Sequence, residues 1–275
     1  MRTWSHVAFA GFCLAAAAAA QQLVTSDGPK FEVVSIREVP RNAPPLLRDP
    51  DASSVLPGGQ YTDPRVTLGS MIVFAYGIRS YLQLQGLPAW AQDGSFAVTA
   101  RPPADFPALS PSANREQVRL MMRSMLADRF HLRLHTETRQ ERIMKLEVAK
   151  GGIKIKEVDP PVPPAKEGRV NAAVGDRDGR MIGNKATMSG MVAALVIFLK
   201  RPVTDATGLT GYYDFDIKWS APDVADGRPA TPGLGAEGIG LLVSVLQSQF
   251  GLRLSSAIGP VEHWIVDQVE PPSAN

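Results

Sequence analysis

Two histidines and two aspartates have spacings that could support metal binding or acid–base catalysis. His131 and His135 lie four residues apart in RFHLRLHTE, and Asp214 and Asp216 lie two apart in YYDFDIKW. Both stretches alternate apolar and polar residues, which predicts strands with these four side chains on their solvent-facing sides. On a strand the histidines would be about 13 Å apart, too far to share one zinc ion, whereas the aspartates would be about 6.6 Å apart, as in some paired-carboxylate sites.

We interpret both pairs first as part of a polar, hydrated sheet face, because ionisable residues are mostly exposed. A catalytic or metal site would need further residues from another strand. One tryptophan joins the surface candidates, because it is out of phase with the apolar residues of its predicted strand. We expect no catalytic, metal-binding or cofactor-binding set. The candidates for contacting a ligand are His131, Arg133, His135 and Trp264.

Three glycines, Gly233, Gly235 and Gly238, spell the pattern G-x-G-x-x-G just before a predicted helix. This pattern indicates a dinucleotide site only where it follows a buried strand. Here it follows RPATP, which cannot form such a strand because proline lacks a backbone donor. We interpret it as a flexible loop. The sequence also contains no G-x-S-x-G, H-E-x-x-H, S-x-x-K or P-loop motif, which lowers the expectation of an enzyme but leaves open a catalytic set without a local signature.

An amphipathic helix followed by two short strands is a pattern that recurs four times, over residues 67–100, 116–149, 187–220 and 238–270. In the second copy the strands at 130–135 and 144–148 predict an antiparallel hairpin, and the fourth copy has strands at 252–255 and 261–269. One unit cannot bury both its helix stripe and a hairpin face, but two units side by side can. We therefore predict an α+β fold in which repeated helix-strand-strand units form two antiparallel sheets, each covered by helices.

The chain is predicted to form two domains. Residues 31–157 would make the first α+β domain, with two of the units and an additional strand, FEVVSIRE. Residues 184–272 would make the second α+β domain, with the other two units. Residues 158–183 are rich in proline, glycine and charge and lack apolar periodicity, so we expect them to be an interdomain linker or loop.

Residues 1–20 have the organisation of an export signal, with Arg2, an apolar run and then small residues before a predicted cleavage after Ala20. Cleavage would remove Cys13, the only cysteine, so the mature chain would have no disulfide. Losing Arg2 lowers the formal charge from +2 to +1, and this near-neutral balance argues against a nucleic-acid partner. No later segment has the unbroken apolar length of a membrane span. We expect export to the periplasm or beyond.

Several strings, in order, resemble the "soil-associated" secreted protein family of soil bacteria. They are FEVVSIRE, AYGI, GLPAW, SFAVTA, LADRFHLRLHTETR, LEVAKGG, RPVTDATGLTGYYDFDIKW and GPVEHWIVDQVEPPSAN. The resemblance extends from Phe31 to Asn275 and implies a domain of unknown function. A similar domain is fused behind membrane metallopeptidases of the BlaR antirepressor type. This chain has no zinc motif, so the resemblance implies neither peptidase activity nor catalytic residues.

These observations lead to three hypotheses. The first is a non-enzymatic module of the cell envelope that binds a peptide, a glycan or another envelope protein through sheet edges and hydrated strand faces. The second is a secreted hydrolase that would bring His131 and His135 together with Asp214 or Asp216 in one pocket. The third is a sensor module, suggested by the fused relatives. We take the first as our main expectation, with no cofactor, no nucleic acid and no membrane span after signal cleavage.

Overall fold

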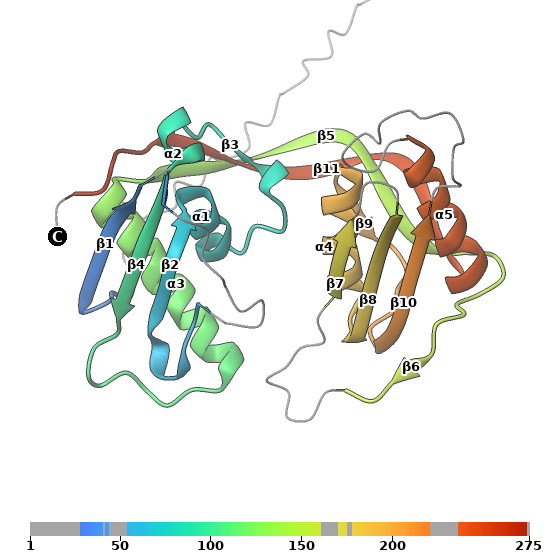
Figure 1. Ribbon diagram of the computed structural model, residues 1–275, viewed down its shortest axis with the longest axis horizontal. Helices are drawn as coiled ribbons and strands as arrows, with labels where there is room; N and C mark the ends of the chain where they lie inside the picture. Colours follow the sequence, from blue (N-terminus) through green and yellow to red (C-terminus); the bar gives the residue numbers. More distant parts are fainter. Residues whose placement is uncertain are drawn as a thin grey trace, which may run out of the picture.

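The computed structural model describes residues 28–40, 42–43, 54–160, 170–174, 178–220 and 236–273. They form two lobes joined by a long two-stranded ribbon (Figure 1). The mixture of helices and open sheets agrees with the predicted α+β class. The predicted signal peptide, Gly233 and Gly235 lie outside the described residues. No helix in these ranges is long and apolar enough to cross a membrane.

The first lobe is built on a three-stranded antiparallel sheet. Its order is β1 (Val33–Val39), β4 (Ser95–Arg101) and β2 (Tyr61–Thr67). Helices α1 (Leu68–Tyr76) and α3 (Pro111–Phe130) pack their apolar residues against it. The short elements of this lobe are η1 (Pro57–Gly59), η2 (Tyr81–Gln83), β3 (Leu84–Gln85) and α2 (Ala89–Asp93).

The second lobe is built on a four-stranded antiparallel sheet. Its order is β6 (Glu157–Val158), β10 (Tyr212–Ser220), β8 (Asp178–Ala186) and β7 (Val170–Val174). Helices α4 (Met188–Leu199) and α5 (Ala236–Phe250) contribute to its core. Segment 158–183 was expected to be a linker. Strand β7 and the first part of β8 lie within it, so part of the segment belongs to the sheet of the second lobe.

Helix ends in both lobes follow the local chemistry of the sequence. Thr67 Oγ1 accepts a hydrogen bond from Ser70 N (3.1 Å), and Thr187 Oγ1 accepts one from Gly190 N (3.3 Å). Each side chain thereby satisfies an N–H group that has no partner inside the helix. Thr67 is the last residue of β2, Thr187 directly follows β8, and the two threonines fix where α1 and α4 begin.

The ribbon consists of two uninterrupted strands, β5 (Arg133–Val148) and β11 (Leu252–Gln268), paired antiparallel along nearly their whole length. Two short strands pair parallel to its edges, β3 to β11 and β9 (Val203–Asp205) to β5. The ribbon is therefore the centre of a third, mixed sheet. The prediction of two sheets was wrong in number, because the described residues form three, and wrong in strand direction for the third alone, since the sheets of the two lobes are antiparallel.

The predicted hairpins at 130–148 and 252–269 were also wrong, because each segment is one continuous strand. The polar residues 136–142 form the middle of β5 and pair with β11 instead of turning. Gly259 and Pro260, which resemble a turn, lie inside β11. A Cβ at Gly259 would lie 2.5 Å from Ile143 Cδ1, so a larger residue there would require the Ile143 side chain to shift.

Each end of the ribbon belongs to a different hydrophobic core. Leu134 of β5 and Val266 of β11 are buried in the core of the first lobe. Leu146 of β5 and Leu252 of β11 are buried in the core of the second lobe. Both lobes therefore contain residues from both long strands, and the last strand of the chain returns to the first lobe.

The two parts of the chain use the same order of elements. Apart from the short helices η2 and α2 of the first part, the series β2-α1-β3-β4-α3-β5 corresponds to β8-α4-β9-β10-α5-β11. Strands β3 and β9 each pair with the long strand of the other series. FHLRL at Phe130–Leu134 corresponds to FGLRL at Phe250–Leu254, 120 positions later. Gln140 pairs with Pro260, its own counterpart at the same offset. The ribbon therefore has approximate two-fold symmetry about this pair.

The residues that follow α3 and α5 are equivalent in the two series, so substituting them tests whether both need a left-handed backbone conformation. His131 and Gly251 follow α3 and α5 and are both left-handed, with φ of 51° and 65°. A Cβ on Gly251 would lie 2.0 Å from the carbonyl oxygen of Gly152. Gly251→Ala should therefore lower the free energy of unfolding by about 2 kcal/mol or more, through conformational strain and displaced backbone.

His131→Gly is the matched substitution and should raise the free energy of unfolding by about 0.5–1 kcal/mol, because glycine adopts this conformation without strain. Urea unfolding of both variants would measure these changes. A Gly251→Ala variant as stable as the wild type would contradict the close approach of Gly152.

Candidate functional site

Seven polar side chains form a connected set on the ribbon and on the neighbouring strand β3, which we call the ribbon network. Four of them alternate along β5, so they lie on the same face of the strand. Two come from β11 and one from β3. In the order of their contacts they are Asp267, His135, Glu137, Arg139, Gln85, His263 and Glu141.

His135 lies between two carboxylates. Its Nδ1 is 2.8 Å from Asp267 Oδ1, and its Nε2 is 3.3 Å from Glu137 Oε1. Carboxylates accept hydrogen bonds, so both ring nitrogens serve as donors when the imidazole is protonated. The hydrogen bond to Asp267, and then the one to Glu137, raise the pKa of His135 above its usual value. With both nitrogens engaged, the ring is not placed to take a proton from a substrate.

Arg139 connects this pair to the rest of the ribbon network. Its Nη2 donates to Glu137 Oε2 (2.6 Å), and its Nη1 donates to Gln85 Oε1 (3.0 Å). The hydrogen bond from Arg139, and then the one from His135, lower the pKa of Glu137. Because the amide oxygen of Gln85 faces Arg139, its Nε2 donates to His263 Nδ1 (3.0 Å).

Because His263 Nδ1 accepts the hydrogen bond from Gln85, the ring proton of the neutral imidazole lies on Nε2. Only 4% of the His263 side chain is exposed, and Nε2 is 2.9 Å from Glu141 Oε1 without making a hydrogen bond. A buried donor without a hydrogen bond costs free energy, which the contact of His263 Nδ1 with Gln85 offsets only in part. The ribbon network thus holds its two histidines in different hydrogen-bonding states.

The opposite end of the ribbon lacks most of these groups. There Glu147 accepts hydrogen bonds from Arg253 (2.7 Å) and Ser255 (2.9 Å), which parallels the contact of Asp267 with His135. Beyond that contact the counterparts are small or apolar. At the 120-residue offset, Glu137, Arg139, Glu141 and His263 correspond to Ala257, Gly259, Val261 and Ile143. The extended network is a property of one end alone.

The structure places the predicted surface residues in different settings. His131 ends α3 and lies 4.0 Å from Glu270, and Arg133 is exposed at the start of β5. Trp264 is half-buried and stacks on Tyr76 at a centroid distance of 5.3 Å, so it contributes to the edge of the first core. His135 alone among the four candidates belongs to the ribbon network.

The two aspartates lie on β10 in the second lobe and have separate partners. Asp216 accepts two hydrogen bonds of 2.7 Å from Arg180, which, with Lys218, lower the pKa of Asp216 to about 2. Asp214 accepts a hydrogen bond from the backbone of Lys185. The histidines and aspartates therefore do not converge in one pocket, which the hydrolase hypothesis required.

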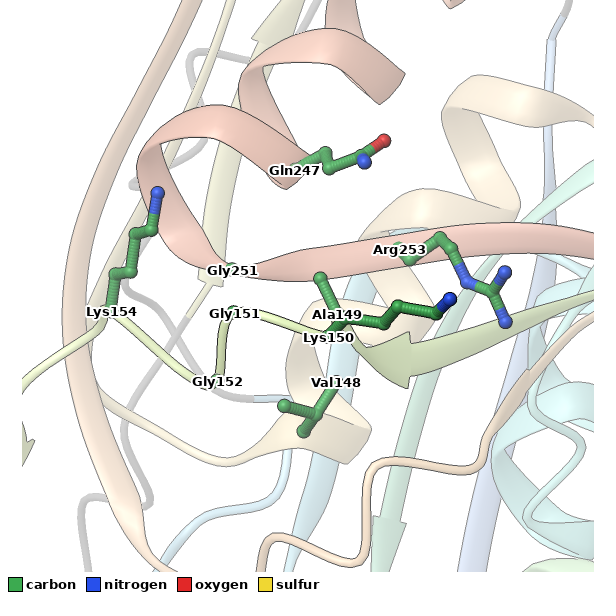
Figure 2. A pocket seen from close by; sticks show the side chains of 9 residues that line it. All are labelled: Val148, Ala149, Lys150, Gly151, Gly152, Lys154, Gln247, Gly251 and Arg253. Atoms are coloured by element: carbon green, nitrogen blue, oxygen red, sulfur yellow. The ribbon is translucent and has the colours of Figure 1, made fainter.

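A second feature lies at the far end of the ribbon, where β5 ends and β11 begins (Figure 2). It is an open cavity of about 460 Å³, which we call the cationic cavity. Three of its lining residues are basic and none is acidic. The lining residues are Val148, Ala149, Lys150, Gly151, Gly152, Lys154, Gln247, Gly251 and Arg253. Sequence reasoning missed this cavity because its two sides are separated by about a hundred residues.

The raised pKa of His135 predicts a pH-dependent contribution to stability. A pKa raised by folding stabilises the folded state fully below the unfolded value of about 6.5, and the stabilisation is lost as the pH rises through the folded-state pKa. The difference in melting temperature between the wild type and His135→Gln should therefore be largest near pH 5.5 and smallest above about pH 8. Thermal unfolding followed by circular dichroism would measure it.

His131→Gln is the matched control, because this imidazole is 55% exposed and lies 4.0 Å from its carboxylate. Its effect should change less with pH, since exposed pairs are screened by solvent. Equal pH dependence of the two variants would show that the contacts of His135 with Asp267 and Glu137 carry no special stabilisation.

Comparison with known proteins places the chain in a family without assigning it an activity. A family model described as "Protein of unknown function (DUF3738)" matches residues 69–269. This range includes every residue of the ribbon network and of the cationic cavity. No curated protein and no solved structure matches the chain. The match covers most of the chain, which therefore belongs to this family of proteins of unknown function.

Proposed function

We propose that the protein is an exported, non-enzymatic binding module of the cell envelope, and that the ribbon network contacts its partner. The observation that carries this proposal is a fixed array of donors and acceptors on a solvent-accessible strand face. Arg139 and Glu137 are each 41% exposed, Asp267 is 39% exposed and Glu141 is 36% exposed. Since neighbouring groups already orient these side chains, binding would order few of them further.

The two-fold relation of the ribbon supports a role in recognition. A polar set needed only to hold two long strands together would be needed at both ends, since both ends pair alike. At the opposite end the side chains of Glu147, Ser255 and Arg253 make the contact between the strands, beside the backbone pairing. The additional residues at the first end therefore suit contact with a partner that offers amides or hydroxyls, such as a peptide, a glycan or the surface of an envelope protein.

The remaining parts of the proposal have their own support. The signal-like residues 1–20 and the resemblance to soil-associated secreted proteins favour export. The matching order of elements and the FHLRL and FGLRL strings favour an internal duplication of one unit containing two helices, in place of four helix-strand-strand repeats. The engagement of both nitrogens of His135 favours binding over proton transfer.

A retention experiment tests the proposed function. The mature chain from Gln21 would be immobilised and exposed to envelope extract and to purified peptidoglycan, and what is retained would be identified by mass spectrometry. Arg139→Gln should retain roughly tenfold less partner than the wild type, because it removes a charged donor that also fixes Gln85.

Arg142→Gln is the matched control, since Arg142 is exposed on the same strand but outside the ribbon network. It should bind like the wild type, and circular dichroism would check that both variants fold. Retention of the same partner by all three proteins would place the contact surface elsewhere. The absence of any saturable partner for the wild type would count against a binding module.

A further inference from the structure

The cationic cavity contains one basic side chain, Lys150, that no described carboxylate of the protein compensates. Arg253 pairs with Glu147 (2.7 Å), and Lys154 Nζ donates to the carbonyl oxygen of Ser248 (2.6 Å). Within the ranges that the structure describes, no carboxylate lies within ion-pair distance of Lys150. Figure 2 shows the side chains of Lys150 and Arg253 extending in the same direction. Neighbouring like charges on one wall favour an anion from outside.

The backbone beside these side chains adds donors. Residues Ala149–Gly152 form a tight turn in which Gly152 N donates to the carbonyl oxygen of Ala149 (2.9 Å). The N–H groups of Lys150 and Gly151 make no hydrogen bond to another residue in the described part of the chain. The turn is held against α5 by Lys154 N, which donates to Phe250 O (3.1 Å). Free N–H groups next to basic side chains suit the oxygens of an anion.

The corresponding place in the first lobe is occupied by a carboxylate of the chain itself. Glu270 is the counterpart of Lys150 at the 120-residue offset, whereas its backbone contact with Phe130 matches the contact of Lys154 with Phe250. The N–H of Glu270 donates to Phe130 O (2.8 Å), and its carboxylate lies 4.0 Å from His131. Arg129 holds the following residues through the Oγ and carbonyl oxygen of Ser273 (3.0 and 2.8 Å). At this position one end therefore carries an acid, whereas the other carries Lys150, and Glu147, an acid near the end of β5, is already paired with Arg253.

From this contrast we propose that the cationic cavity binds a carboxylate of an acidic peptide. Lys150 and Arg253 contact the carboxylate, and the turn at Lys150–Gly151 donates backbone N–H groups to it. The cavity volume of about 460 Å³ admits a side chain together with part of its backbone. The site is separate from the ribbon network, so its test does not depend on the function proposed for that network.

Fluorescence anisotropy with defined peptides tests this site. The probe is a labelled hexapeptide with two glutamates and both termini capped, and the matched probe has glutamines in their place. The glutamate peptide should bind, with an affinity that falls as salt is added. Lys150→Gln should weaken it roughly fivefold to tenfold, and Lys150→Arg should restore most of the binding.

Lys156→Gln is the control, because Lys156 is exposed two residues beyond Lys154 and does not line the cavity. It should change the affinity less than about twofold. Arg253→Gln is a second test on the same wall, with unfolding curves to show that loss of the Glu147 pair leaves the fold intact. A further arm with inorganic phosphate as competitor separates a peptide carboxylate site from a general anion site.

Equal binding of the glutamate and glutamine peptides would overturn the proposal. So would equal effects of Lys150→Gln and Lys156→Gln, which would indicate diffuse attraction to a basic surface. Displacement of the peptide by phosphate at a similar concentration would also overturn it, because the cavity would then bind small anions in general and not a peptide carboxylate.

Discussion

The backbone pairing of β5 with β11 is the constraint on which the rest of the structure depends. It brings both long strands into both lobes. Leu134 and Val266 therefore lie in the first core, and Leu146 and Leu252 lie in the second. The short strands β3 and β9 complete the arrangement by pairing with the long strand of the other half of the chain. The lobes are therefore interlocked through main-chain hydrogen bonds, and their separation is set by a sheet.

Because the ribbon has approximate two-fold symmetry about Gln140 and Pro260, the side chains at its two ends can be compared position by position. At one end the chain places His135 and His263 in a connected polar set and covers the neighbouring helix end with Glu270. At the other end the strands are held by a simpler contact, and the helix end is bordered by Lys150 and Lys154. Similar backbones thus present two chemically different surfaces, and each surface can be altered without altering the other.

Much of the local structure could be predicted from the sequence, and the pairing could not. Helices α1 and α4 start at Thr67 and Thr187, where hydroxyl caps precede apolar stripes. The strands of the ribbon also alternate as expected, but alternation does not say whether a polar stretch turns or continues. Residues 136–142 continue because a partner strand more than a hundred residues away satisfies them. His135 was a candidate from its spacing, whereas its partner Asp267 is 132 positions away and is brought near only by the register.

The return of β11 to the first lobe has a consequence for the order of folding. The first core is incomplete without Val266, which follows the end of α3 by more than a hundred residues. An emerging chain can form α1 and α3 early, but their apolar faces stay partly open to water until the final strand arrives. Such long-range pairing slows folding, because the entropy of closing a large loop is lost before the contacts form. The first lobe to be synthesised is therefore completed only after the second lobe has followed it, and its apolar surface favours aggregation until β11 is available.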